Sequence, residues 1–292
     1  MPARLEATNS PLNRYLDSVK HLPTSPTLLI KMIKLFRQPD RDIDEIVSLM
    51  QMDPAFTAEV LRRCNSSFFG SEEPVFDVGE AIFRLGFYEV YRMNVSMFGW
   101  QAVSKAKDMK CYPLQRLWEH CAITAIAAGT MARELEESEG VAFTAGLLHD
   151  VGKIALAAAD GNAYEELLQQ QGNFGPGLSE AEHARFGFSH GEIGAQLLHR
   201  WGVPQEISVP VLCHHQMGWD GPLERVGAIL NLADQMAHCI QDETAEKPCH
   251  LPEGMKATAF LKVAPERAPA LEQAVREEVK RSLSLFSVQG MN

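Results

Sequence analysis

The sequence has few of the features that would mark a nucleic-acid-binding protein. Its 27 Lys and Arg residues are outnumbered by 38 Asp and Glu residues, which gives a formal net charge of −11, and the basic residues form no cluster. Because nucleic acids are bound largely through phosphate contacts with Lys and Arg, we expect no nucleic-acid partner. The charge still allows a small phosphorylated ligand that is held by one or two local cations.

Long apolar runs and paired cysteines are also lacking. The first residues have no apolar signal-peptide core, and the longest uncharged apolar-rich run, residues 121–132, is shorter than the roughly 20 residues that cross a bilayer. The six cysteines form no CxxC pair. We therefore expect a cytoplasmic protein with no membrane partner and with reduced thiols rather than a disulfide framework.

Alternating strand patterns are absent too, and apolar residues recur instead at helical spacing. The sequence predicts an all-α protein with a helical N-terminal subdomain (residues 1–110), a helical bundle (111–241), and a loop with a C-terminal helix (242–292). Asp77 with Glu80 resembles a capping box that starts a helix which Gly86 can end, and Ser189 with Glu192 forms a second capping box. Pro210 should kink or split the helix in which it lies. The expected helices cover about residues 26–36, 42–51, 54–64, 77–86, 88–105, 114–136, 141–159, 190–202, 204–216, 223–240 and 269–286.

The stretch LLHDVGK, residues 147–153, places charged groups in an otherwise apolar segment. On one helix over residues 141–159, His149, Asp150 and Lys153 share an arc of about 100°. A solvated face is the ordinary explanation, but the rest of the arc is small or apolar, so we expect burial. A buried Asp150 needs a partner, which could be Lys153 or a metal ion with His149 as a second ligand.

Other ionisable groups are also isolated in apolar helical segments. Each has an ordinary explanation by itself, since a lone core histidine is usually hydrogen-bonded. Together they offer nitrogen and oxygen ligands suited to one or two divalent transition metals such as iron or manganese, with Asp150 able to bridge two ions. The candidate ligands are His120, His149, Asp150, His190, His214, His215 and Asp234.

The order H…HD…H…HH…D resembles the HD superfamily of metal-dependent phosphohydrolases, and HDOD proteins within it. The resemblance covers about residues 17–240 and includes HLPTSPTLLIKMIKLFRQPD, MDPAFTAEVLRRCNSSFFG, EAIFRLG, LLHDVGK, FSHGEIGAQLLHRWGVP and VLCHH. It implies an HD-like helical bundle with a helical N-terminal subdomain and a role in bacterial signal transduction. Most HDOD modules have no assigned catalysis.

The resemblance also implies roles for individual residues. Asp150 would join both metal positions, and Lys153 would face a substrate phosphate or another anion. Relative to the related HD-GYP phosphodiesterases, the segment after His215 has no Gly-Tyr-Pro, and Arg116 replaces a glutamate that some of them use for a third metal. The first position would be formed by His120, His149, Asp150 and Asp234, and the second by Asp150, His190, His214 and His215.

Three functions follow as hypotheses. The first is a non-catalytic signalling module whose partners are signalling proteins or a small phosphorylated ligand. The second is a metal-dependent phosphodiesterase acting on a cyclic dinucleotide or another phosphodiester, with Asp150 and Lys153 as catalytic residues. The third is a helical bundle with a satisfied polar core and no metal. The sequence leaves the oligomeric state open.

The remaining histidines have simpler interpretations. His238 follows Asp234 by one helical turn and is a candidate to orient that carboxylate. Surface or loop positions are expected for His21, His183, His199 and His250.

Overall fold

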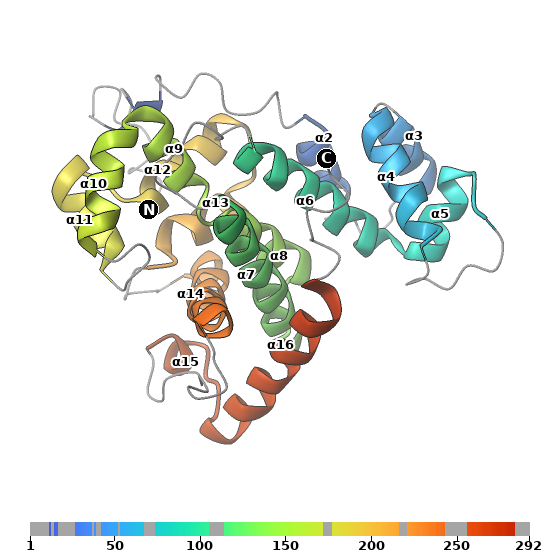
Figure 1. The fold of residues 1–292 in the computed structure, drawn as a ribbon. Coiled ribbons are helices and arrows are strands. Elements are labelled where there is room, and N and C mark those ends of the chain that lie inside the picture. The colour runs from blue at the N-terminus through green and yellow to red at the C-terminus, as the bar shows by residue number, and fades with distance from the viewer. Residues whose placement is uncertain are drawn as a thin grey trace. The chain divides into compact units, whose positions relative to one another are not determined.

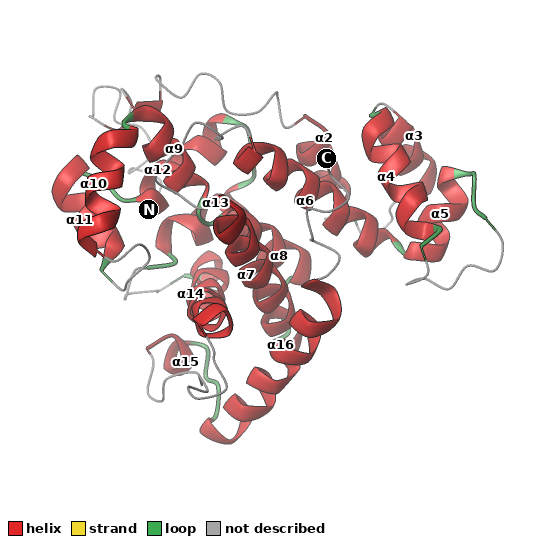
Figure 2. Cartoon of the chain, viewed as in Figure 1, coloured by secondary structure: helices red, strands yellow, loops and turns green. Residues whose placement is uncertain are grey.

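A computed structural model shows a chain built of helices (Figures 1 and 2). It describes residues 12, 15, 16, 27–36, 38, 42–51, 53–66, 74–104, 114–171, 177–215, 221–242 and 256–283. No strand occurs among these residues, which confirms the prediction of an all-α protein. The helices are α2 (Thr27–Phe36), α3 (Ile43–Gln51), α4 (Pro54–Cys64), α5 (Val78–Leu85), α6 (Phe87–Ser104), α7 (Leu114–Glu134), α8 (Glu139–Leu148), α9 (Val151–Ala159), α10 (Gly161–Gln171), α11 (Leu178–Phe186), α12 (His190–Arg200), α13 (Gln205–Cys213), α14 (Pro222–Asp242), α15 (Lys256–Phe260) and α16 (Ala268–Ser282), with a 3₁₀ turn, η2 (Pro265–Arg267), before the last of them.

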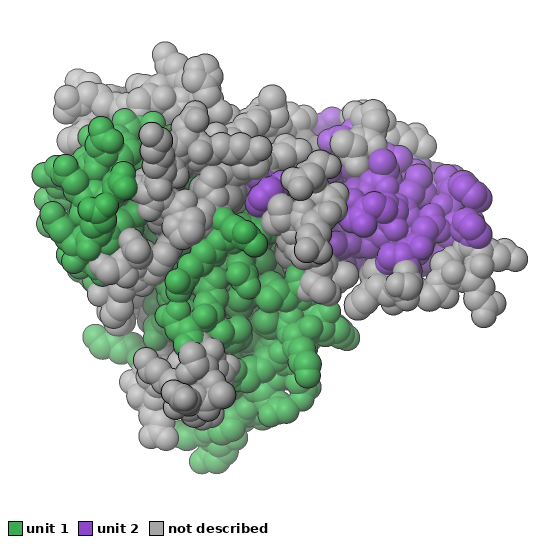
Figure 3. All heavy atoms as spheres, viewed as in Figure 1, with its two compact units in different colours: residues 1–24, 101–292 green, residues 25–100 purple. Residues whose placement is uncertain are grey.

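The chain divides into two compact units, coloured separately in Figure 3. The smaller unit comprises residues 25–100, and the larger unit comprises residues 1–24 and 101–292. The three-part division expected from the sequence stays a prediction. All seven candidate ligands belong to the larger unit.

Local capping signals set the helix boundaries of the smaller unit. The Asp77 carboxylate accepts a hydrogen bond from the Glu80 amide at 2.8 Å, and Gly86 ends α5 with a φ of 82°. Both features were expected from the sequence, because a side-chain acceptor starts a helix and glycine adopts a positive φ without strain. The Asn65 amide also clamps the backbone of Val75 through two hydrogen bonds of 2.7 and 2.8 Å.

In the larger unit, α7 lies at the centre and packs against α8, α14 and α16. The expected last helix therefore packs back on the bundle. The α7 segment AITAIAAGTMA is rich in alanine, which lets neighbouring helices approach closely. A Cβ atom added at Gly146 of α8 would lie 2.8 Å from the Ala125 Cα atom of α7, so glycine permits this crossing.

A second close crossing joins α9 to α12. A Cβ atom added at Gly152 would overlap the carbonyl oxygen of His190, and one added at Gly194 would lie 3.1 Å from the Gly152 nitrogen. Ser189 and Glu192 form the expected capping box at the start of α12. The glycine contact and the cap together place the first turn of α12 beside LLHDVGK.

The LLHDVGK segment does not lie on one continuous helix. The prediction of a single helix over residues 141–159 is wrong at His149 and Asp150, where a turn separates α8 from α9. Asp150 has φ −96° and ψ 8°, outside the helical region. Residues 139–159 are long and apolar enough to resemble a membrane span, but 89% of the apolar window is buried inside the protein, as in a core helix.

Some other details differ from the sequence-based expectation. Helices α10, α11 and α15 were not anticipated. Pro210 lies within α13 without splitting it, which rules out one of its two expected effects. Cys64, Cys121 and Cys213 are free thiols as expected, whereas Cys239 is disulfide-bonded, so the expectation of reduced thiols is wrong for Cys239.

Candidate metal centre

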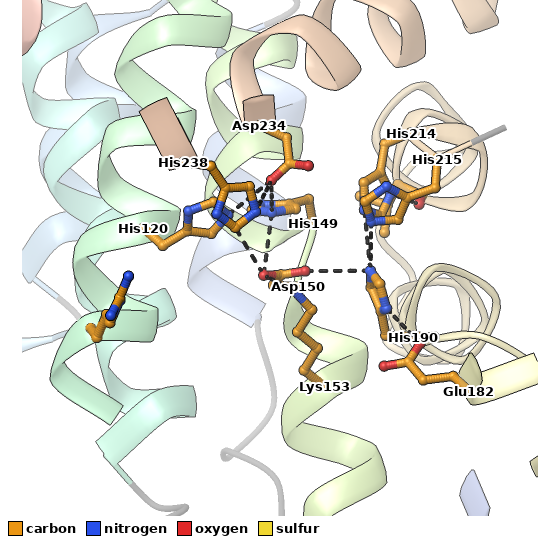
Figure 4. A network of polar contacts seen from close by, with 12 residues as sticks. His120, His149, Asp150, Lys153, Glu182, His190, His214, His215, Asp234 and His238 are labelled. Carbon is orange, nitrogen blue, oxygen red and sulfur yellow. Dashed lines mark hydrogen bonds and ion pairs between the residues drawn. The ribbon is translucent and has the colours of Figure 1, made fainter. Parts of the chain in front are cut away.

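The seven candidate ligands converge on one region of the larger unit (Figure 4). They come from helices that are distant in the sequence and adjacent in the fold. His120 lies on α7, His149 and Asp150 in the α8–α9 turn, His190 at the start of α12, His214 and His215 at the end of α13, and Asp234 on α14. The structure therefore brings together every residue of the predicted set, while their role as ligands stays a prediction.

Burial of these groups is nearly complete. His149, His190 and His214 have no exposed surface, and Asp150 is 1% exposed. This confirms that the polar arc of LLHDVGK does not form a solvated face. Charged and polar groups at such depth must be compensated by hydrogen bonds, ion pairs or a bound ion.

One group of side chains surrounds the Asp234 carboxylate. Asp234 Oδ1 lies 2.9 Å from His120 Nε2 and 3.6 Å from His149 Nε2. His149 Nε2 is also 3.4 Å from Asp150 Oδ2. These atoms match the first metal position implied by the family resemblance.

A second group of imidazole rings lies on the other side of Asp150. His190 Nε2 is 3.0 Å from His215 Nε2 and 3.4 Å from His214 Nε2. Asp150 Oδ1 is 3.5 Å from His190 Nε2. Asp150 thus presents Oδ2 to the first group and Oδ1 to the second, as a carboxylate that bridges two ions would.

Hydrogen bonds at the far side of the rings define which nitrogens are free to bind a cation. The Nδ1–H of His149 donates to the Gly146 carbonyl at 2.7 Å, and that of His214 donates to the Val211 carbonyl at 2.6 Å. A carbonyl can only accept, so each neutral ring keeps a lone pair on Nε2. His149 Nε2 and Asp150 Oδ1 receive no hydrogen bond from the described part of the chain.

These nitrogen and oxygen atoms therefore face one another at short distances. His214 Nε2 and His190 Nε2 lie 3.4 Å apart, and His149 Nε2 faces two carboxylates. Burial acts to lower the pKa of His149, but Asp150 and Asp234 outweigh it and raise that pKa. Divalent cations at the two positions would satisfy these atoms, and imidazole with carboxylate is a donor set typical of first-row metals. The residues fit the metal that the family resemblance implies.

The electrostatics of the metal-free site support this chemistry. Burial acts to raise the pKa of Asp150, but His149 and Lys153 outweigh it and hold that pKa well below its usual range. Burial and the neighbouring His215 hold the pKa of His214 well below the ordinary histidine value. Asp150 is thus anionic and His214 neutral, which are the forms that bind metals.

Lys153 contacts the shared carboxylate directly. Its ammonium donates to Asp150 Oδ2 at 2.7 Å, and the residue is 4% exposed. Burial alone would lower the pKa of Lys153, but Asp150 raises it, so the ammonium stays charged. Lys153 and a metal ion were the two partners considered for Asp150, and the structure shows the contact with Lys153. The predicted contact of Lys153 with a phosphate stays a prediction.

Glu182 was missed at the sequence level. This fully buried carboxylate on α11 accepts hydrogen bonds from the Nδ1 and the backbone amide of His190, at 2.6 and 2.7 Å. The Tyr164 hydroxyl donates to its other oxygen at 2.8 Å. A carboxylate behind a ligating histidine fixes the ring and strengthens Nε2 as a donor, but nothing in the acidic segment LSEAEHARF distinguishes Glu182 from its neighbours.

Of the remaining histidines, one lies beside the centre, two are exposed, and two lie outside the described residues. His238 joins the first group, with Nε2 3.5 Å from Asp234 Oδ1, and burial lowers its pKa to about 4. His183 and His199 are exposed, as expected. His21 and His250 lie outside the described residues.

Comparison with known proteins identifies the family. The HDOD domain model matches residues 22–217, which confirms the resemblance, and the chain belongs to the HDOD family. The fold is also similar to solved structures. An HDOD domain protein with unknown function from Geobacter sulfurreducens superposes with a TM-score of 0.69 at 22% identity and covers 94% of both chains. A candidate signal transduction protein from Marinobacter aquaeolei VT8 gives a TM-score of 0.74 at 22% identity, over 99% of this chain and 68% of the other.

Curated relatives match over part of their length. An uncharacterized protein of Treponema pallidum is 25% identical over 209 residues, which are 69% of this chain and 39% of the relative. A ribonuclease Y of Syntrophobacter fumaroxidans is 28% identical over 189 residues, 64% of this chain and 29% of the relative. The chain thus spans less than half the length of these relatives.

Proposed function

We propose that this chain is a metal-binding signalling module of the HDOD type, which acts in the bacterial cytoplasm and catalyses no reaction itself. The observation that carries the proposal is the placement of imidazole lone pairs and carboxylate oxygens on both sides of Asp150. Bound divalent ions such as iron or manganese would neutralise the carboxylates and join α7, α12, α13 and α14 at one point. Occupancy of the site would then set the stability of the bundle.

Burial of the centre favours binding over turnover. Catalytic metal sites keep a position open to water and substrate, whereas structural sites are closed. Here His149, Asp150 and Lys153 are each at most 4% exposed. The absent Gly-Tyr-Pro segment supports the same conclusion.

The smaller unit is the part that we assign to partner recognition. Two large apolar side chains at its surface, Phe76 and Phe83, are 84% and 83% exposed. Exposed aromatic residues of this kind are typical of protein interaction surfaces. The partner would be another signalling protein, and a small phosphorylated ligand at the centre would be the alternative input.

Elemental analysis tests metal binding. Full-length chain purified without chelator should contain about one to two equivalents of a transition metal. Asp150→Ala should lose most of this metal, because both groups lose their shared carboxylate. Asp242→Ala, which removes an exposed carboxylate paired with Arg116, should keep it. Wild-type chain that contains no metal and takes up none on reconstitution would refute the proposal.

The second candidate function is a metal-dependent phosphodiesterase. It is favoured by Lys153, whose ammonium lies beside the shared carboxylate and could hold a phosphate oxygen, and by the similarity to ribonuclease Y. Divalent ions in such enzymes activate water and polarise the phosphate. Metal-loaded wild type that hydrolyses a cyclic dinucleotide or bis(p-nitrophenyl) phosphate, with an inactive Asp150→Ala variant, would establish this candidate. Absence of turnover in the loaded wild type would eliminate it.

A further inference from the structure

One histidine beside the centre has no place in the two metal positions described above. His238 lies on α14, one helical turn after Asp234, and its Nε2 atom is 3.5 Å from Asp234 Oδ1. The same oxygen is 2.9 Å from His120 Nε2. Three donor atoms from three residues therefore gather within 4.8 Å of one another.

The orientation of the His238 ring suits a shared ion. Its centroid is 4.4 Å from that of His120, with 31° between the ring planes. Two rings that overlap in this way direct both Nε2 atoms toward Asp234 Oδ1, as Figure 4 shows. Metal–nitrogen and metal–oxygen bonds of about 2.1 Å place neighbouring ligand atoms about 3.0–3.4 Å apart, close to the spacings observed.

A hydrogen bond to Asp234 would be the simpler role for His238. The separation of 3.5 Å is longer than the 2.7–3.2 Å usual for such a bond. Asp234 already accepts a shorter contact from His120 through the same oxygen. A hydrogen bond to Asp234 therefore does not account for where the His238 ring lies.

Exposure distinguishes His238 from the other members of the group. Its side chain is 30% exposed, whereas those of His120 and Asp234 are 2% and 6% exposed. His238 consequently lies at the boundary between the buried centre and solvent.

We propose that His238 is an additional metal ligand, which binds the ion of the first position together with His120 and Asp234 and faces solvent. The inference rests on the proposed metal-binding function. A nitrogen donor on the solvent side occupies a position that water would hold in an open site, so it closes the site and slows exchange of the ion.

Cobalt release from the full-length chain tests this role. The chain is freed of metal with chelator, reloaded with Co²⁺, and mixed with excess EDTA while the visible absorption of the bound Co²⁺ is followed. His238→Asn should release one equivalent at least about 10-fold faster than wild type, taking the lower bound for loss of a supporting group at a metal site. Its spectrum should also change, because one nitrogen donor is lost.

The matched control is His199→Asn, which alters an exposed histidine on α12 and should release Co²⁺ at the wild-type rate. A second variant, His238→Gln, guards against a folding defect. If loss of the imidazole is the cause, His238→Asn and His238→Gln should both release Co²⁺ faster while their thermal melts show a folded chain. Wild-type release rate and spectrum in a folded His238 variant would overturn the inference while leaving metal binding intact. A wild-type chain that takes up no Co²⁺ would overturn the proposed function, and this inference with it.

Discussion

Replacement of Gly152 by alanine should disrupt the contact that places His190 in the centre. The added Cβ atom would overlap the His190 carbonyl oxygen and lie 2.7 Å from its carbonyl carbon and 2.9 Å from the Gly194 nitrogen. All three atoms belong to the backbone of α12 or its first turn, so no side chain can rotate away. Relief requires α9 and α12 to separate, which moves His190 away from Asp150.

The size of the effect follows from two opposing terms. Overpacking of a core typically costs about 1–3 kcal/mol, and contacts with backbone belong at the upper end. Alanine recovers about 1 kcal/mol of helix propensity relative to glycine. The net loss of about 2 kcal/mol corresponds to a Tm lower by roughly 4–8 °C for a domain of about 200 residues.

Thermal unfolding of metal-free and metal-loaded chains measures this prediction. Gly152→Ala should melt earlier and bind less metal at the second position, because its His190 ligand is displaced. Gly161→Ala is the control, since its added Cβ atom would meet nothing within 4 Å, and its Tm should not fall. A Gly152→Ala chain with wild-type Tm and metal content would refute the reasoning about this helix crossing.

Two further predictions concern the carboxylate behind His190 and the dependence of stability on pH. Glu182→Gln keeps the shape of the side chain but removes the charge that holds His190 Nδ1–H, so metal affinity at the second position should fall by about 10–100-fold. Glu180→Gln, an exposed change on the same helix, should leave that affinity unchanged in equilibrium dialysis. The pKa values of His215 and His238 are lowered from 6.5 to about 3 and about 4 in the folded chain. The unfolded chain therefore binds more protons below pH 6.5, and the metal-free protein should lose stability as the pH falls from about 6.5 toward 4. Urea unfolding of His238→Asn over this range should show a shallower dependence than wild type, and an identical slope would contradict the assignment.

Helix positions were predictable where local signals define them. The Asp77 cap with Gly86 and the capping box of Ser189 and Glu192 both appear as expected. Such signals act over one helical turn, so the sequence contains all the information needed. Helix α11, however, has no clearly apolar face that would mark it in the sequence. Its buried Glu182 is recognised only through the contact with His190.

The turn at His149 and Asp150 was not predictable from helical periodicity. Periodicity over residues 141–159 is helical throughout, and no proline or glycine marks a break between α8 and α9. The break is compatible with the contacts that Asp150 makes with Lys153 on one side and His190 on the other. The contact with His190 joins segments that are distant in the sequence, so local periodicity does not contain it.

The sequence by itself determined that the chain is helical and which side chains could bind a metal, because helical periodicity and ionisable groups in apolar segments are local properties. Tertiary structure alone decided how those side chains meet. The glycine contacts at Gly146 and Gly152 set the helix crossings, and these crossings direct the two oxygens of Asp150 toward different groups. His238 was recognisable as a neighbour of Asp234 from its spacing, but only the folded chain showed its ring 4.4 Å from that of His120 at the edge of the centre.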